Sequence, residues 1–212
     1  MAKNKNCESL EEGTFMKIPC SGVILAGGLN SRFFGTNKAL IRVEGQYILD
    51  RIYHVFREVF DEIILITNDP LPYLDWDFTI MSDIFSVRSS LTGIHAGLFC
   101  TTHPYAFFTA CDTPFLKKEL IETLVNRIEE RFDVIVPETS AGLEPLCAIY
   151  SQRCIQPIET RLERQQFKIR QFFKKTRVRK VREDVLRESD PNLVSFFNIN
   201  TPDELEKARS IR

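Results

Sequence analysis

Short apolar runs rich in Val, Ile and Phe alternate along this 212-residue chain with longer amphipathic stretches. The alternation is typical of βαβ units and constrains the chain to an α/β fold, with a mainly parallel sheet flanked by helices. The predicted strands cover residues 23–26, 63–67, 105–110, 134–136 and 146–150. Apolar spacing predicts crossover helices over 48–60 and 117–131. Thr201 and Pro202, after a short strand, predict a closing helix that reaches Ile211.

The length suits one domain, because domains commonly contain about 100 to 200 residues. No internal repeat or Gly/Ser linker divides the chain. We therefore expect a flexible N-terminal tail over 1–20 and one domain over 21–212. The apolar runs are far shorter than the roughly 20 residues of a membrane helix, and residues 1–17 lack the apolar region of a signal peptide. These features predict a cytoplasmic protein without a membrane span.

The six cysteines and three histidines show no spacing typical of a metal site. No C-x-x-C pair occurs, and four of the cysteines lie in or beside apolar runs, which is typical of buried thiols. We expect reduced packing residues rather than disulfides or zinc ligands.

Positive charge is concentrated in one segment. Ten basic residues and one acidic residue lie from Arg161 to Arg182, so this segment carries +9 in a chain whose net charge is −1. Apolar residues at 158, 162, 169 and 172 keep helical spacing, which favours an amphipathic helix with a solvated basic face. The alternative is a surface for a phosphorylated ligand. Nucleic-acid binding is not expected, because the positive charge is confined to this segment. The segment also lacks the aromatic residues that lie between basic residues in RNA-binding surfaces.

A glycine-containing loop follows the first predicted strand. Residues 25–38 read LAGGLNSRFFGTNK. Glycines allow backbone N–H groups to approach an anion, and Arg32 and Lys38 add mobile positive charge, so the segment indicates a phosphate-binding loop. The pattern is neither G-x-G-x-x-G nor a Walker A motif, since no Gly-Lys-Ser/Thr follows Gly35. The glycines by themselves are also typical of a structural β-turn that binds no phosphate.

The spacing of this loop resembles that of nucleotidyltransferases that activate small phosphorylated molecules. Within that group, the chain most resembles the molybdenum cofactor guanylyltransferases, from about residue 21 to the C-terminus. Four further segments match in order, at 82–83, 110–114, 144–150 and 198–205. Two positions depart from the family: Phe33-Phe34 replaces the usual Met-Gly, and residues 89–93 read SSLTG in place of the more frequent G-P-L-x-G.

The resemblance implies a single-domain Rossmann-like fold and transfer of GMP from GTP to the phosphate of molybdopterin or Mo-molybdopterin, with release of pyrophosphate. It also implies molybdopterin-delivering and molybdoenzyme maturation proteins as partners. The alternatives are a related transferase that uses CTP or another phosphorylated acceptor, and a non-catalytic nucleotide-binding protein.

The same resemblance implies roles for individual residues. The implied catalytic residues are Arg32, Lys38 and Asp112. The implied GTP contacts are Leu25, Ala26, Gly27, Gly28, Lys38, Asn68, Asp83 and Asp112. The implied Mg²⁺ ligands are Asp112 and Asn200, and the implied molybdopterin contacts are Asn198, Asn200, Lys174 and Lys175. For Asn198 and Asn200, contact with the pterin or a cap of the last helix is the alternative to a metal role.

Several of these residues have structural alternatives. Asp112 follows a predicted strand, where ligands collect at the carboxyl edge of a parallel sheet, and one carboxylate suffices for Mg²⁺ that binds with a triphosphate. Its alternative role is to cap a helix after Pro114. Asp83 is expected to accept hydrogen bonds from guanine, with a turn residue as its alternative. The turn-forming sequence Asn68-Asp-Pro gives Asn68 the same alternative.

Overall fold

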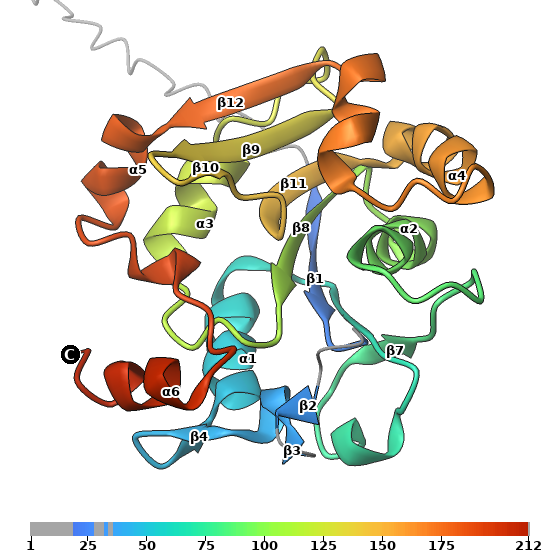
Figure 1. Ribbon diagram of the computed structural model, residues 1–212. Coiled ribbons are helices and arrows are strands. Elements are labelled where there is room, and N and C mark those ends of the chain that lie inside the picture. The colour runs from blue at the N-terminus through green and yellow to red at the C-terminus, as the bar shows by residue number, and fades with distance from the viewer. Residues whose placement is uncertain (1–18, 28–31, 34–35, 212) are drawn as a thin grey trace, which may run out of the picture.

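The computed structural model describes residues 19–27, 32–33 and 36–211. Within these residues, an eight-stranded sheet forms the centre of the molecule (Figure 1). Its strands are β1 (Cys20–Leu25), β6 (Ile63–Ile66), β7 (Thr79–Met81), β8 (Tyr105–Ala110), β9 (Val134–Thr139), β10 (Gly142–Leu143), β11 (Cys147–Ser151) and β12 (Val178–Arg182). Their order is β10-β9-β11-β8-β1-β6-β7, with β12 also paired to β9.

The central strands are parallel. β1 lies between β6 and β8 and runs in the same direction as both. Leu25 is in register with Ile66 on one side and with Ala110 on the other. The carboxyl ends of these three strands therefore meet at one edge of the sheet, which is where ligands bind in open α/β folds.

Helices cover both faces of the sheet (Figure 1). They are α1 (Ile48–Val59), α2 (Ser90–Cys100), α3 (Lys118–Val125), α4 (Ile155–Glu163), α5 (Glu183–Ser189) and α6 (Pro202–Ala208). Because side chains alternate along a strand, Ile24 and Phe107 pack toward α1, α3 and α5, while Val23 and Phe108 pack toward α2 and α4. The result is a three-layer α/β/α domain with a hydrophobic core on each side of the sheet.

Short elements complete the described chain. The strands β2 (Arg32–Phe33) and β3 (Thr36–Asn37) form one pair, and β4 (Arg42–Val43) and β5 (Gln46–Tyr47) form another. The 3₁₀ helices are η1 (Lys38–Leu40), η2 (Leu71–Tyr73), η3 (Gln152–Cys154), η4 (Ile169–Lys175) and η5 (Val194–Phe196).

The main elements predicted from the sequence are confirmed. The five predicted strands correspond to β1, β6, β8, β9 and β11, and the two predicted crossover helices correspond to α1 and α3. α3 is shorter than predicted, because the N–H groups of Arg127 and Ile128 bond to carbonyls three residues earlier and the chain tightens into turns. β1 begins at Cys20, one residue before the predicted start of the domain. Residues 1–18 of the predicted tail lie outside the described residues.

The prediction of a single amphipathic helix in the basic segment is wrong. The segment contains the end of α4, the 3₁₀ helix η4 and the strand β12. Asp133 directs β12 to β9, because its carboxylate accepts hydrogen bonds from the backbone N–H of Arg177 at 2.9 Å and from the Arg177 and Arg153 guanidinium groups. Burial opposes ionisation of Asp133, but these bonds prevail and lower its pKa. Arg177 of the segment thus has a structural role, because it links the start of β12 to the start of β9.

The prediction of a short strand before Asn198 is also wrong. The chain forms η5 there, because Leu193 adopts a left-handed conformation with φ 53° and the N–H of Ser195 bonds to Asp190 Oδ2 at 2.8 Å. α6 begins as predicted, with Thr201 as its N-cap and Pro202 as its first residue. It ends at Ala208, before the predicted end.

The cysteines that the structure describes are all free, as expected. Four of them, Cys20, Cys111, Cys147 and Cys154, are buried. Within the same residues, no helix combines the length and apolar character required to cross a membrane.

The packing of α2 on the sheet gives a first prediction. A Cβ atom on Gly97 would lie 2.6 Å from Phe108 Cε1 and 2.8 Å from Val23 Cγ1. We expect Gly97→Ala to destabilise the fold by about 1 to 3 kcal/mol through overpacking, although alanine is normally the better helix former. Urea unfolding measures the change, and Gly97→Ala in a Phe108→Leu background recovers part of it. A variant as stable as the parent would contradict this packing.

Candidate functional site

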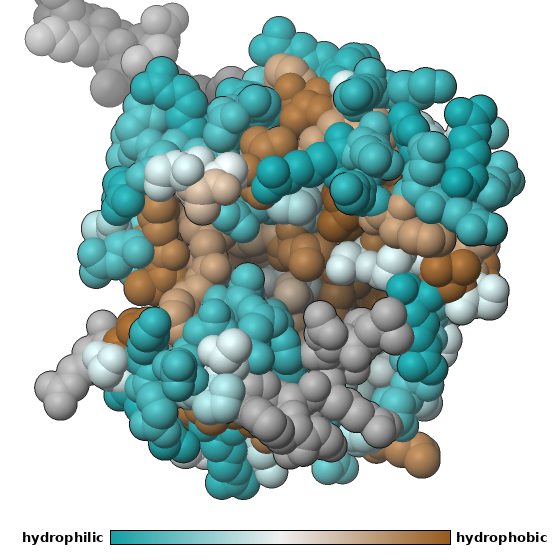
Figure 2. Space-filling model, in the orientation of Figure 1, coloured by the Kyte–Doolittle hydropathy of each residue, from teal (hydrophilic) through white to brown (hydrophobic). Residues whose placement is uncertain are grey.

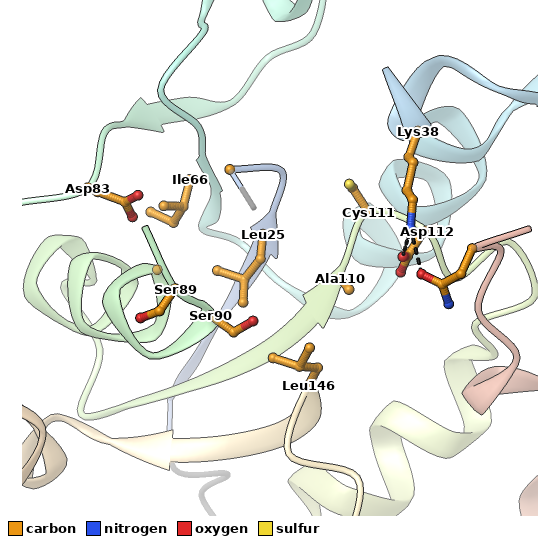
Figure 3. A pocket seen from close by; sticks show the side chains of 13 residues that line it. Leu25, Lys38, Ile66, Asp83, Ser89, Ser90, Ala110, Cys111, Asp112 and Leu146 are labelled. Atoms are coloured by element: carbon orange, nitrogen blue, oxygen red, sulfur yellow. Dashed lines mark hydrogen bonds and ion pairs between the residues drawn. The ribbon is translucent and has the colours of Figure 1, made fainter. Parts of the chain in front are cut away.

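A pocket of about 210 Å³ opens at the carboxyl ends of β1, β6 and β8 (Figure 3). On the face shown in Figure 2, apolar side chains lie in a hollow over the end of β8. The predicted site residues that line the pocket are Leu25, Gly27, Lys38, Asp83, Asp112 and Asn200. The fold therefore assembles in one place residues that are up to 175 positions apart in the sequence, from 25 to 200.

A buried cation occupies one end of this pocket. Lys38 Nζ donates hydrogen bonds to Asp112 Oδ2 at 3.1 Å and to Asn200 Oδ1 at 2.6 Å (Figure 3). The side chains of Lys38 and Asp112 are 5% and 16% exposed. Burial strengthens such a contact relative to a surface ion pair, because less water screens the charges. We call this cluster of Lys38, Asp112 and Asn200 the cation end of the pocket.

The backbone at Lys38 is held by its neighbour. Asn37 caps η1 by accepting a hydrogen bond from the N–H of Ala39 at 3.1 Å, and its amide donates to the Tyr73 hydroxyl at 2.7 Å. Asparagine suits this position, because its side chain mimics a backbone acceptor at a helix start. The sequence Asn-Lys therefore directs the lysine side chain to the sheet edge.

Backbone hydrogen bonds hold the two partners of Lys38. The N–H of Ile199 bonds to the carbonyl of Asp112 at 3.0 Å, which joins the segment before α6 to the end of β8. Glu204 Oε2 accepts from the N–H of Asn200 at 2.7 Å and from that of Thr201 at 2.8 Å. The bond from Thr201 belongs to the capping box of α6. These bonds position the backbones of Asp112 and Asn200 independently of Lys38.

Cys111 lines the same pocket but is not suited to nucleophilic catalysis. Burial, together with the adjacent Asp112 carboxylate, raises the pKa of Cys111 to about 12. The thiol form therefore dominates near neutral pH, whereas the thiolate is the nucleophile.

Asp83 lies at the opposite end of the pocket from Asp112 (Figure 3). Its carboxylate accepts a hydrogen bond from Asn68 Nδ2 at 2.8 Å, and its backbone N–H donates to Asn68 Oδ1 at 3.1 Å. Burial raises the pKa of Asp83, and the bond from Asn68 partly opposes this. The adjacent wall contains Gly93, whose lack of a side chain leaves space beside Leu25 and Asp83. A Cβ at this position would lie 3.1 Å from Leu25 Cδ2 and 3.9 Å from Asp83 Oδ1. We call this the base end.

One wall of the pocket was not predicted from the sequence, and the N-terminus of α2 provides it. The residues missed there are Ser89, Ser90 and Gly93, and the opposite side adds Leu146. Ser89 caps α2 by accepting a hydrogen bond from the N–H of Thr92 at 3.1 Å. A serine before an apolar run is a recognised helix start, so the sequence contained this signal.

Other predicted site residues lie elsewhere. Ala26 is buried beneath the pocket, with its N–H bonded to the carbonyl of Ile66 at 2.8 Å. Asn198 is exposed and does not line the pocket. Asn68 contributes only through its contact with Asp83. Gly28 and Phe34 lie outside the described residues, as do the side chains of Arg32 and Phe33.

The predicted lysines of the basic segment lie on η4. Lys174 and Lys175 are both exposed. Lys175 lines a separate hollow, with Arg161 and Arg164 among its other lining residues, and this hollow shares no residue with the pocket that contains Lys38.

The cation end has the donor set of a magnesium site. Asp112 and Asn200 direct a carboxylate and an amide oxygen at one positive group, the Lys38 ammonium. Such oxygens are ligands that Mg²⁺ accepts, together with substrate phosphates and water. The described residues contain no group of three or more His, Cys, Asp or Glu side chains that could hold a metal by themselves. A site completed by a nucleotide needs fewer protein ligands.

Comparison with known proteins identifies the family. The model of the MobA-like NTP transferase domain matches residues 22–181. The chain belongs to the MobA-like NTP transferase family. It is 48% identical, over 90% of its length and 94% of the relative, to a protein named molybdenum cofactor guanylyltransferase from Desulfosudis oleivorans. A probable molybdenum cofactor guanylyltransferase from Natranaerobius thermophilus is 36% identical over 89% of this chain and 94% of the relative.

A solved structure supports the same assignment. The chain is similar to molybdopterin-guanine dinucleotide biosynthesis protein A from Archaeoglobus fulgidus, with a TM-score of 0.79 and 26% identity. The match covers 90% of this chain and 97% of that one. As a MobA-like NTP transferase, the protein is an enzyme of the nucleotidyltransferase class, and its pocket lies where this class of fold is open to ligands.

The wall of this transferase pocket gives a second prediction. Ser89→Ala removes the N-cap of α2 and should lower the free energy of unfolding by about 1 kcal/mol. Ser90→Ala is the matched control, because Ser90 is exposed and caps nothing. Urea unfolding of the two variants compares them directly, and equal losses of stability would rule out the capping role.

Proposed function

We propose that the enzyme transfers GMP from GTP to the terminal phosphate of molybdopterin or Mo-molybdopterin. The observation that carries the proposal is one pocket with Lys38, Asp112 and Asn200 at one end and Asp83 at the other. A nucleoside triphosphate matches this arrangement, because its anionic oxygens lie at one end of the molecule and its base lies at the other. The name of the D. oleivorans relative, which is 48% identical, supports guanylyl transfer.

In this reaction an oxygen of the acceptor phosphate attacks the α-phosphorus of GTP. The new P–O bond forms as the bond between the α-phosphorus and the bridging oxygen breaks, and pyrophosphate leaves with the electron pair. A phosphate monoester carries about −1.5 to −2 charge near pH 7, so the main obstacle is repulsion between anions. Positioning and charge stabilisation therefore supply the catalysis. Cys111 is not required as a nucleophile.

The cation end binds the triphosphate in this proposal. Lys38 donates to the phosphate oxygens, with help from Arg32 and the backbone N–H groups of the loop over 25–28. Asp112 and Asn200 are the residues that would hold Mg²⁺. That ion would neutralise charge on the triphosphate and on the leaving pyrophosphate.

The base end selects guanine. An ionised Asp83 accepts hydrogen bonds from N1–H and the exocyclic amino group of guanine, whereas the corresponding edges of adenine and cytosine carry an acceptor at the ring nitrogen. Asn68 orients this carboxylate through its 2.8 Å bond. Leu25 and Ile66 supply apolar surface beside it.

The acceptor approaches the cation end from the side of the segment before α6. We assign Asn198 to contact with the pterin, and Lys174 and Lys175 to attraction of its phosphate or its delivery protein. Cytoplasmic localisation, partner proteins that deliver molybdopterin and maturation proteins that receive the product belong to the same proposal.

The experiment that tests this function is pyrophosphate release from GTP in the presence of Mg²⁺ and molybdopterin. We expect turnover by the parent enzyme and a loss of at least about 10²-fold for Asp112→Ala, because a metal anchor is removed. Asp184→Ala is the control, since this exposed carboxylate of α5 pairs with Arg182. Turnover of Asp112→Ala close to that of the parent, with the fold intact, would exclude the metal role.

A further inference from the structure

Lys38 lies where a metal ion would be expected. Its ammonium group contacts both oxygens that we assign to Mg²⁺, at 3.1 Å from Asp112 Oδ2 and 2.6 Å from Asn200 Oδ1. The lysine side chain is only 5% exposed, so little solvent competes for these contacts. In this arrangement the protein itself neutralises the Asp112 carboxylate.

The ammonium group and a metal ion cannot occupy this place together. Mg²⁺ binds oxygen at about 2.0 to 2.1 Å, so an ion on Asp112 and Asn200 would lie beside Lys38 Nζ. Like charges at such short distances repel strongly in a site with little water. Occupation by the metal therefore requires the lysine side chain to move.

The backbones of Asp112 and Asn200 keep their places when the lysine side chain moves. The hydrogen bond from the Ile199 N–H to the Asp112 carbonyl, at 3.0 Å, joins the two segments without Lys38. Glu204, a residue of the α6 capping box, also accepts a hydrogen bond from the backbone N–H of Asn200 at 2.7 Å. The backbone of Lys38 is likewise held by the Asn37 cap, so only the flexible lysine side chain has to change its conformation.

We propose that Lys38 is a place-holding cation, which excludes Mg²⁺ from the nucleotide-free enzyme and yields the site when a triphosphate draws its ammonium group away. The triphosphate supplies anionic oxygens to both positive groups, so lysine and metal cease to compete. Metal binding is thereby coupled to nucleotide binding. This inference rests on the proposed function, because it takes Asp112 and Asn200 as the metal ligands.

Mn²⁺ binding to the nucleotide-free protein, measured by electron paramagnetic resonance, tests the inference without turnover. We expect Lys38→Met to bind Mn²⁺ at least tenfold more tightly than the parent, because the competing charge is gone while the backbones of Asp112 and Asn200 stay in place. In the double variant Lys38→Met/Asp112→Asn the gain should be lost. Lys118→Met is the matched control, since it also removes one positive charge, from an exposed pair with Glu58 on α1 and α3, and its Mn²⁺ affinity should equal that of the parent.

A GTP analogue with a methylene group between the α- and β-phosphorus supplies the second arm. It should tighten Mn²⁺ binding to the parent much more than to Lys38→Met. Lys38→Gln, which keeps a hydrogen-bond donor without the charge, should behave like Lys38→Met and replaces it if thermal unfolding shows that the methionine variant is misfolded. Nucleotide-free Lys38→Met and Lys38→Gln with parental Mn²⁺ affinity would overturn the proposal.

The result is separable from the test of the proposed function. A tenfold gain in Mn²⁺ affinity without GMP transfer by the parent would retain the place-holding role and refute guanylyl transfer. Normal GMP transfer without any gain in Mn²⁺ affinity would refute the place-holding role alone.

Discussion

The hydrogen bond between the Ile199 N–H and the Asp112 carbonyl is the constraint on which the site depends. It joins the end of β8 to the segment before α6, two parts of the chain that are far apart in the sequence. With α6 capped by Thr201 and Glu204, it sets the separation between the backbones of Asp112 and Asn200. The Lys38 ammonium then donates to one side-chain oxygen of each residue.

The rest of the pocket depends on the parallel centre of the sheet. Because β1, β6 and β8 end at one edge, the loops after them bring the cation end and the base end onto the same surface. α2 closes one side of that surface, and its glycines at 93 and 97 allow close approach to β1 and β8. Packing and function are thus linked, since the same helix that completes one core also forms a wall of the pocket.

The elements that could be predicted are those whose pattern lies within their own short stretch of sequence. The apolar runs of β1, β6 and β8 and the amphipathic pattern of α1 were sufficient for the fold class. α2 was not predicted, because Leu91, Ile94, Ala96 and Leu98 are all buried and such a helix has little polar face to reveal its period. The pairing of β12 was not predictable from its charges either, since it depends on the contact of Arg177 with the distant Asp133.

The same distinction applies to the site. Lys38, Asp83, Asp112 and Asn200 each stood out through local motifs and the family resemblance, and the structure brings all four to one pocket. Their direct contacts are non-local, so no pattern in the sequence indicated that Lys38 lies between the two proposed metal ligands. The lining serines of α2 were missed for a simpler reason, because no helix had been assigned there.

Competition between nucleotides is the sharpest test of guanylyl transfer by this pocket. The enzyme is incubated with Mg²⁺, molybdopterin and equal concentrations of GTP, CTP and ATP, and the dinucleotide product is identified by mass spectrometry. We expect GMP to be incorporated in large excess over CMP and AMP, with one pyrophosphate released for each product formed. Predominant incorporation of CMP or AMP, or no dinucleotide at all, would contradict the proposed function.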